Sequence, residues 1–234
     1  MLVLRKGGEF TDRQISKYLF TGLICFAFAI MAMVATRYIE IPLVGLLVVG
    51  LAISAFKANF RRWGNWQAGK RGELAVTDPL TSLSNDYVVL NDLTLPDGKG
   101  NVDHLVIGPD AVFVLETKNY AGRVKCLGDN WYVNGNPVKS LSRQAKSNAM
   151  AVRSNLARVF SDHGRRLPFV VAVLVFVNRR GGLHLNNPVI PVLKSKDVAE
   201  FIRSYGSGHS DPGFSPELKR AMVHHLHMLQ RLAA

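Results

Sequence analysis

The chain has 234 residues, with 29 Lys and Arg against 17 Asp and Glu, which gives a formal net charge of +12. Its contents of 48% hydrophobic and 20% charged residues exclude a disordered tail and a collagen-like chain, and they fit one domain of ordinary size with an additional segment. The two cysteines, Cys25 and Cys126, lie far apart, which excludes a disulfide scaffold and makes no zinc-binding pattern. The basic excess indicates a polyanionic partner, either nucleic acid or an anionic membrane surface, and composition does not choose between them.

Two uncharged apolar segments lie near the N-terminus. The first, Tyr18 to Thr36, would form a helix of about 28 Å, enough for the hydrocarbon core of a bilayer. The second, Ile41 to Phe56, would reach roughly 24 Å, and Lys57 can lengthen it by snorkelling. A cleaved signal peptide is the alternative for the first segment, and an interfacial or re-entrant helix for the second. The length of the first and the lack of a charged face on the second favour a transmembrane hairpin over residues 18–56.

Basic residues flank this expected hairpin on both sides, whereas its connecting turn holds only Arg37. The positive-inside rule therefore predicts a multi-pass cell-membrane protein with two helices, with both termini and the soluble domain in the cytoplasm. Part of the net charge belongs to these flanks and need not indicate nucleic acid. The flanking residues are Arg5, Lys6, Arg13 and Lys17 before the hairpin, and Lys57, Arg61, Arg62, Lys70 and Arg71 after it.

Turn residues and hydrophobic periodicity divide the soluble part into a helix, three strands, a small hairpin, a long helix, a buried strand and a last helix. Short turns between the three strands predict an antiparallel meander. The expected bounds are a helix at 68–77, strands at 87–95, 102–107 and 111–118, hairpin strands at 122–127 and 131–133, a helix at 141–163, a strand at 169–177 and a helix after 215. The expected organisation is an N-terminal cytoplasmic tail (1–17), the transmembrane hairpin (18–56), a juxtamembrane segment (57–66), a soluble domain (67–182) and a C-terminal extension ending in a helix (183–234).

Charged residues interrupt two of the otherwise apolar strands. Asp103 lies near the start of the second strand, and Glu116 and Lys118 lie at the end of the third. Residues two apart in a strand share a face, so Glu116 and Lys118 point to one side and Thr117 to the other. An antiparallel pairing centred on the turn at 108–110 then sets Asp103 near Glu116. Two carboxylates at strand ends suit Mg²⁺, and the adjacent ammonium group can orient a water molecule or stabilise charge on a phosphate.

The Glu-x-Lys spacing alone is a weak signal. A second example, Glu217 with Lys219, falls in an expected helix, where residues two apart do not face each other. The alternative for Glu116 and Lys118 is a structural ion pair at a solvated end of the sheet.

The segment from about Gln67 to Asn178 resembles the nuclease-related domain family (NERD), which belongs to the restriction-endonuclease-like superfamily of metal-dependent nucleases. The resemblance is carried in chain order by GKRGE, YVVLNDLTL, NVDHLVIGPDAVFVLETKNYAGRV, GDNW and SRQAKSNA. This ordered set is far more specific than the charged triplet. It implies an α/β fold with a restriction-endonuclease-like core, in which a helix, a three-stranded meander, a helix and a strand form a mixed sheet flanked by helices. Here two transmembrane helices would precede that core.

The resemblance also implies hydrolysis of phosphodiester bonds in DNA or RNA with Mg²⁺ or Mn²⁺ as cofactor. By position, Asp103 matches the metal-binding aspartate of the family, and Glu116 and Lys118 match its acid-x-Lys pair. Asp103, Glu116 and the main-chain carbonyl of Thr117 would hold the metal, and Lys118 would position the attacking water.

Two helix residues complete the implied set. Glu73 matches the glutamate that helps to complete the metal shell, and Gln144 matches the glutamine that contacts the site or the phosphate. Pro79 comes early in the first helix for this family, which questions the length of that helix but not the position of Glu73.

The long helix carries cations that can track a phosphate backbone near Gln144, with Arg143, Lys146 and Arg153 as candidate nucleic-acid-binding residues. A solvated helix face and an anionic lipid surface are the alternatives for these side chains. The first hypothesis for function is a membrane-anchored, cytosolic, metal-dependent nuclease. The rivals are a catalytically idle nucleic-acid-binding or scaffold module of the same fold, and a lipid-facing adaptor. The residues do not distinguish DNA from RNA, or single from double strands.

Overall fold

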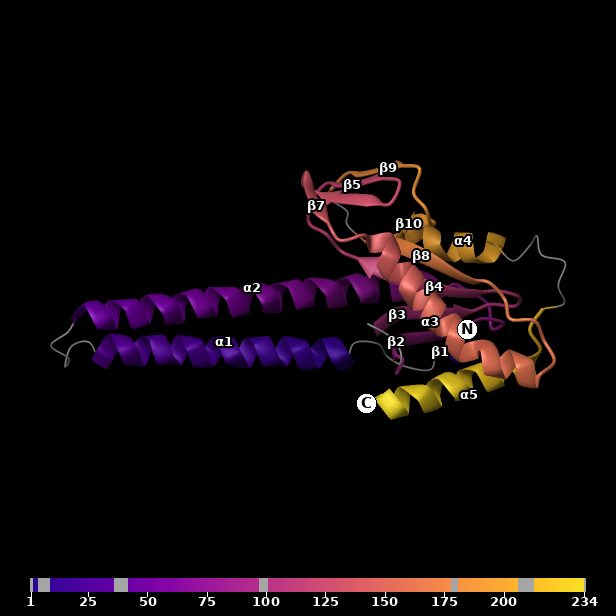
Figure 1. The fold of residues 1–234 in the computed structure, drawn as a ribbon, viewed down its shortest axis with the longest axis horizontal. Coiled ribbons are helices and arrows are strands. Elements are labelled where there is room, and N and C mark those ends of the chain that lie inside the picture. Colours follow the sequence, from indigo (N-terminus) through magenta and orange to yellow (C-terminus); the bar gives the residue numbers. More distant parts are fainter. Residues whose placement is uncertain are drawn as a thin grey trace. The chain divides into compact units, whose positions relative to one another are not determined.

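The computed structural model describes residues 2–3, 9–35, 42–96, 101–177, 181–205 and 213–233 (Figure 1). The chain divides into two compact units, one of residues 8–71 and one of residues 72–234 together with residues 1–7. In chain order the elements are β1 (Leu2–Val3), α1 (Glu9–Ala35), α2 (Pro42–Leu80), β2 (Val88–Thr94), β3 (Asn101–Ile107), β4 (Val112–Lys118), β5 (Val124–Leu127), β6 (Asn130–Val133), β7 (Asn136–Val138), α3 (Leu141–Asp162), β8 (Val170–Phe176), β9 (Leu183–Asn186), β10 (Val192–Lys194), a 3₁₀ turn (Ser195–Asp197), α4 (Val198–Tyr205) and α5 (Pro216–Ala233).

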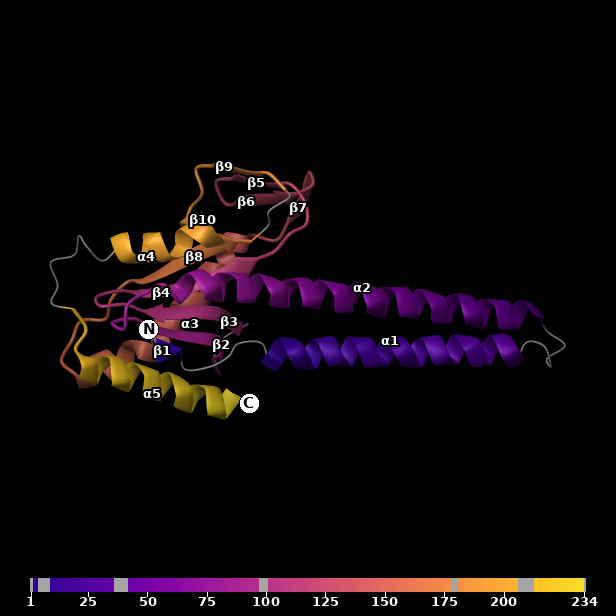
Figure 2. The same ribbon diagram turned by 180° about the vertical axis from the view of Figure 1, so that it is seen from behind.

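In the unit of residues 8–71, α1 and the first part of α2 run side by side (Figures 1 and 2). The rings of Phe26 and Phe56 lie 5.4 Å apart between centroids. At the other end of the pair, Lys70 forms an ion pair with Asp12. Gly22 faces Asn59 and Phe56 across the helix pair. These contacts make an antiparallel helical hairpin.

Within the described residues, one helix near the N-terminus is long and apolar enough to cross a membrane, over Thr11–Ala35. Only 11% of its most apolar window is buried, whereas the core helix of a soluble protein would be mostly buried. The second expected span, Ile41–Phe56, does not meet the same criterion over the described part of α2, and its first residue lies outside the described ranges. The finding therefore supports one candidate span, not two.

Helix α2 is longer than the sequence predicted. It joins the expected second apolar segment, the juxtamembrane segment and the expected first helix of the domain into one helix of 39 residues. No proline interrupts the helix before Pro79, and the glycines in between weaken a helix without breaking it. Pro79 lies in the last turn, so the helix ends at Leu80, close to the predicted end.

The main sheet of the other unit has the strand order β1-β2-β3-β4-β8-β10. Strands β2, β3 and β4 pair antiparallel, as the short turns predicted. Strand β8 pairs parallel with both β4 and β10, and β1 pairs parallel with β2, so the sheet is mixed. Every residue of β8 is buried, which confirms the prediction of a strand covered on both faces.

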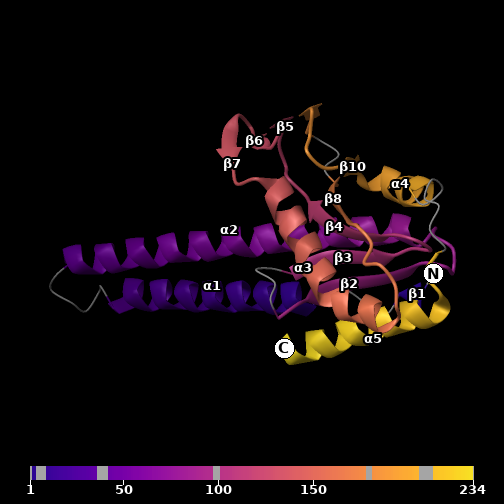
Figure 3. The ribbon, with the colours of Figure 1, turned by 45° about the vertical axis from the view of Figure 1, so that its right-hand side comes forward.

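Helices cover both faces of this sheet (Figures 1 and 3). On one face α3 and α5 pack over the sheet, and on the other lie the end of α2 and α4. The first core includes Leu105, Val114, Leu156, Leu174 and Met222, and the second includes Leu80, Val106, Phe113, Val173 and Ile202. The mixed sheet flanked by helices agrees with the predicted fold class.

A second, smaller sheet has the order β7-β6-β5-β9. The predicted hairpin is its β5–β6 pair. Asn134-Gly135, a dipeptide typical of tight turns, leads into β7, which was not among the predicted strands. Both turn residues have positive φ, 51° and 83°, as a type I′ hairpin turn requires. Trp131 links this sheet to the main one, because its ring stacks on Phe176 with centroids 5.8 Å apart.

The domain boundaries differ from the sequence prediction at both ends. Strand β1, from the expected N-terminal tail, is hydrogen-bonded to β2, and β10, from the expected C-terminal extension, completes the other edge of the same sheet. Helix α5 buries Leu218, Met222 and Leu226 in the core. Strands of two or three residues carry too little pattern to be recognised in a sequence. The segment after residue 182 is therefore an integral part of the domain.

Candidate active site

The turn between β3 and β4 fixes which side chains of the two strands meet. The Gly108 N–H donates to the Ala111 carbonyl at 2.8 Å, and the strands pair from Ile107 with Val112 to His104 with Leu115. The next position in this register sets Asp103 opposite Glu116. The Asp103 carboxylate accepts the main-chain N–H of Thr117 at 2.7 Å. The two acids therefore meet at the end of the hairpin that the sequence predicted.

Helix α3 completes a cluster around Glu116. Lys118 Nζ donates to one oxygen of Glu116 at 2.7 Å and to Gln144 Oε1 at 3.0 Å. Asn148, one helical turn after Gln144, donates to the other oxygen of Glu116 at 3.1 Å and to the Asn101 carbonyl at 3.2 Å. Glu116 is only 2% exposed, so these partners replace water around a buried carboxylate.

The electrostatics of this cluster favour a bound cation. Burial and the neighbouring Glu116 raise the pKa of Asp103 well above its usual range, although the Thr117 N–H opposes the shift. Burial also raises the pKa of Glu116, against the opposing effects of Lys118 and Asn148. Burial lowers the pKa of Lys118, but Glu116 outweighs it and the net shift is upward. The site therefore holds two carboxylates that disfavour each other's charge, and an ammonium group that keeps its proton.

Glu73 belongs to α2, whose last turns pack on the face of the sheet opposite α3. The charge of Glu73 makes a small contribution to the raised pKa of Asp103, after burial, Glu116 and the opposing Thr117 N–H. The helix can come so near the sheet because residue 72 is glycine. A Cβ at position 72 would lie 2.9 Å from the Cβ of Asn119 and 3.5 Å from the Thr117 methyl group. Gly72 therefore permits the close approach of α2, which carries Glu73, to Thr117 and Asn119.

Two neighbouring side chains lie outside the cluster. Thr117 turns toward α2, as the strand alternation predicted. His104 is buried on the same face of the sheet, and its Nδ1 lies 2.8 Å from Asn91 Oδ1. Burial lowers the pKa of His104 to about 4, so the imidazole is neutral at ordinary pH. His104 packs in the core and does not join the acidic site.

Asn148 was not among the predicted site residues. It lies four residues after Gln144, so both side chains stand on one face of α3. A helical asparagine within an apolar stripe is a signal, because a buried amide needs partners. Its two bonds join Glu116 on β4 to the start of β3 and hold the acid in place.

The donor set is compatible with Mg²⁺ or Mn²⁺. Asp103 and Glu116 offer oxygen ligands, and Mg²⁺ in proteins commonly takes one or two carboxylates and completes its shell with water and substrate phosphate. Their raised pKa values mean that a cation would relieve unfavourable charge. Within the described part of the chain, no group of three or more His, Cys, Asp or Glu side chains forms a metal cage. The residues thus suit a site that substrate helps to complete.

Comparison with known proteins finds a family match in this region. Residues 68–177 match the nuclease-related domain family, NERD. The matched segment covers somewhat less than half of the chain and contains Glu73, the β3–β4 acids, Lys118 and Gln144.

One curated relative also aligns with this chain. An uncharacterized protein of Bacillus anthracis is 34% identical over 90 residues, which make up 36% of this chain and 41% of that protein. The chain thus spans about two fifths of the length of that relative. No solved structure matches the chain. The family match therefore suggests a nuclease-related function for the matched segment.

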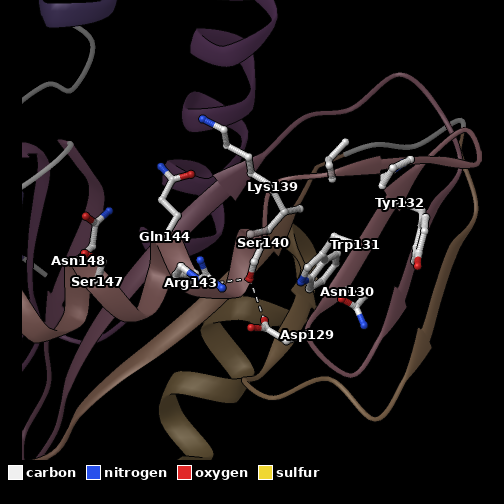
Figure 4. Close-up of a pocket in the computed structure, with 13 residues that line it drawn as sticks. Asp129, Asn130, Trp131, Tyr132, Lys139, Ser140, Arg143, Gln144, Ser147 and Asn148 are labelled. Carbon is white, nitrogen blue, oxygen red and sulfur yellow. Dashed lines mark hydrogen bonds between the residues drawn. The ribbon is translucent and has the colours of Figure 1, made fainter.

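A cleft adjoins the cluster within the segment that matches the nuclease-related domain family (Figure 4). Its volume is 860 Å³, and Gln144 and Asn148 belong both to its wall and to the cluster around Glu116. Arg143 lines the same cleft. Lys146 and Arg153 do not, because they follow Gln144 by two and nine residues and so lie about 200° and 180° around the helix. The structure brings one of the three candidate nucleic-acid-binding cations to the site.

Gly72→Ala tests how α2 positions Glu73. We expect a lower melting temperature, because the new methyl group meets the Cβ of Asn119. Gly69→Ala is the matched control, since a Cβ there meets nothing within 4 Å and alanine should stabilise the helix by about 0.5–1 kcal/mol. Thermal unfolding of the full chain in detergent measures both. Equal melting temperatures for the two variants would contradict the close approach.

Proposed function

We propose that this protein hydrolyses phosphodiester bonds of nucleic acid in a reaction that depends on Mg²⁺ or Mn²⁺. The observation that carries the proposal is the meeting of Asp103, Glu116 and Lys118 at one end of the β3–β4 hairpin, inside the segment that matches the nuclease-related domain. Gln144 and Asn148 hold this group from α3.

The side chains divide the chemistry between them. Asp103, Glu116 and the Thr117 carbonyl would hold the cation, with Glu73 at its outer side. When bound, the cation supplies Lewis acidity toward the phosphate and lowers the pKa of a water molecule. Asn148 fixes Glu116, and Gln144 fixes the end of Lys118.

Lys118 acts as a cation in this proposal and not as a base. Its pKa is raised by Glu116, so it keeps its proton at neutral pH. A charged ammonium group cannot accept a proton from water, but it can donate a hydrogen bond to a water molecule or to a phosphate oxygen. Lys118 would therefore orient the nucleophile and stabilise the charge that develops on the phosphate.

We also propose that α1 and the first part of α2 anchor the domain in a membrane as two spans, 18–36 and 41–56. Large apolar side chains are exposed on both helices, for example Phe20 at 67% and Leu46 at 70%. Such surfaces are normally covered by lipid or by a partner. Strand β1 precedes α1 and pairs with β2, which follows α2, so both ends of the hairpin enter the same unit. If α1 crosses the bilayer, α2 has to return the chain to the same side.

Epitope tags test this arrangement. Tags at either terminus should resist external protease in intact cells, and a tag inserted after Arg37 should be cleaved. The flanking cations give the orientation, with both termini in the cytoplasm. A control with permeabilised cells should expose all three tags. Cleavage of a terminal tag in intact cells would contradict the two-span hairpin.

The activity is tested on the full chain in detergent, because residues 2–3 form a strand of the sheet and truncation would remove it. Labelled single- and double-stranded DNA and RNA are incubated with Mg²⁺, with Mn²⁺ and with chelator. We expect cleavage that requires the cation and that identifies the substrate. A folded protein that binds the oligonucleotides without cleaving any of them would favour the idle binding module instead.

A further inference from the structure

The cleft beside the cluster has a chemistry of its own. Its lining combines two cations, Lys139 and Arg143, with the half-buried aromatic ring of Tyr132 and several hydroxyl and amide groups. Asp129 is the one acid among the thirteen lining residues, and its carboxylate accepts the Ser140 hydroxyl at 2.9 Å. Figure 4 shows Lys139 and Gln144 extending to the same side of α3. Positive charge therefore stands beside the residues that hold Lys118 and Glu116.

Hydrogen bonds fix the walls of this cleft in place. Ser140 Oγ accepts the Arg143 N–H at 3.1 Å and caps α3, while its own proton goes to Asp129 on the turn before β6. Trp131 Nε1 donates to Ser142 Oγ at 2.9 Å. The small sheet is thus attached to the first turn of α3, and the cleft is preformed, as ligand-binding sites usually are.

A second hollow adjoins the first at Tyr132, which lines both. It has a volume of 800 Å³ and contains the exposed cations Arg123 and Lys125 and no acid. Lys125 stands opposite Tyr132 in the β5–β6 pair. From the catalytic cluster outward, the chain thus presents Arg143 and Lys139, then the ring of Tyr132, then Lys125 and Arg123.

We propose that these two hollows form one groove for an unpaired strand of polynucleotide that leads to the catalytic cluster. The identity of the strand as substrate rests on the proposed function, whereas its binding does not. Cations that follow a backbone, with an aromatic ring between them, are the arrangement by which proteins hold single strands. A base can stack on Tyr132 only when it is not already stacked between its neighbours in a duplex. A duplex would therefore contact the cations but not the Tyr132 ring.

The test measures binding to the full chain carrying Asp103→Asn, so that cleavage does not consume the probe. The probe is a fluorescent single-stranded DNA of mixed sequence, about 12 nucleotides long, with the blunt duplex of the same sequence for comparison. Tyr132→Leu should weaken single-strand binding by about 5- to 150-fold and leave duplex binding nearly unchanged. Lys139→Ala with Arg143→Ala should lower the slope of log affinity against log salt by about 1.4.

Lys146→Ala with Arg158→Ala is the matched control. It removes the same charge from exposed positions of α3 outside the cleft and should leave the salt slope within error of the parent. Circular dichroism and melting temperature show that each variant is folded. The proposal would be overturned if the groove variants bind the single strand as tightly as the parent does. It would also be overturned if Tyr132→Leu weakens duplex binding as much as single-strand binding. Displacement of the probe by short-chain phosphatidylserine at equal concentration would assign the groove to lipid and overturn it too.

Cleavage by otherwise wild-type chains separates the two proposals. Metal-dependent cleavage that groove variants leave unchanged would overturn the groove and keep the nuclease. Binding that groove variants lose, in a chain that cleaves nothing, would keep the groove and overturn the nuclease.

Discussion

Asp103→Asn should abolish metal-dependent cleavage and at the same time raise the melting temperature of the metal-free protein. The loss of activity should be about 10³-fold or more, since in the proposed reaction Asp103 would hold the metal ion that supplies several kcal/mol of transition-state stabilisation. Asparagine keeps an oxygen that can accept the Thr117 N–H, so the hairpin should stay intact. Asp162→Asn is the control, because this acid is exposed at the end of α3.

The stability half of this prediction has a definite dependence on pH. The pKa of Asp103 is raised in the folded state by burial and by Glu116, so the ionised carboxylate opposes folding. The free energy of unfolding is therefore highest below the unfolded pKa of about 3.9, where Asp103 is protonated in both states. It decreases as the pH rises through the raised pKa of the folded state. The gain from Asp103→Asn should therefore be larger at pH 8 than at pH 4 in chelator. Mg²⁺ should raise the melting temperature of the wild type and not that of the variant.

An equal gain at both pH values would mean that the carboxylate ionises freely in the folded protein. A variant that still cleaves as fast as the wild type would remove Asp103 from the reaction. The two readouts are independent, since the first concerns stability without metal and the second concerns cleavage with metal present.

The β3–β4 hairpin could be predicted from the sequence because both of its determinants are local. The turn at Gly108 sets the register, and the alternation of buried residues sets the faces, so the approach of Asp103 to Glu116 followed. The Glu-x-Lys pattern at 217–219 lies on helix α5, where residues two apart do not face each other, as predicted.

The features that could not be predicted depend on contacts between residues far apart in the sequence. The parallel pairing of β4 with β8 depends on α3 as a crossover, and β1 and β10 are too short to show a pattern. In the sequence Asn148 is only a polar residue of a helix, and its hydrogen bond to Glu116 depends on how α3 packs on β4. Lys139 and Tyr132 lie in a loop and a hairpin, and only the attachment of the small sheet to α3 places them in the same cleft as Gln144.

Lys118→Met should lower both activity and stability. Glu116 and Lys118 have side-chain exposures of 3% and 16%, so their ion pair is largely shielded from water. Removing one partner of a buried pair leaves the other charge uncompensated, which typically costs about 3–5 kcal/mol. For a domain of this size the melting temperature should fall by roughly 10 °C, as measured by thermal unfolding in chelator at neutral pH. The solvated ion pair that the sequence left as an alternative would lose about 1 kcal/mol or less.

Glu116→Gln combined with Lys118→Met separates two causes of lost stability: the unpaired buried charge of Glu116 and the lost packing of the Lys118 side chain. Glutamine can still accept a hydrogen bond from Asn148, and it carries no charge that needs the ammonium group. The double variant should therefore recover most of the stability that Lys118→Met loses, while cleavage stays absent. If the double variant is as unstable as the single one, the loss comes from the aliphatic part of Lys118 and not from Glu116. Recovery of stability without activity would show that the pair is kept for chemistry, because an uncharged pair holds the fold equally well.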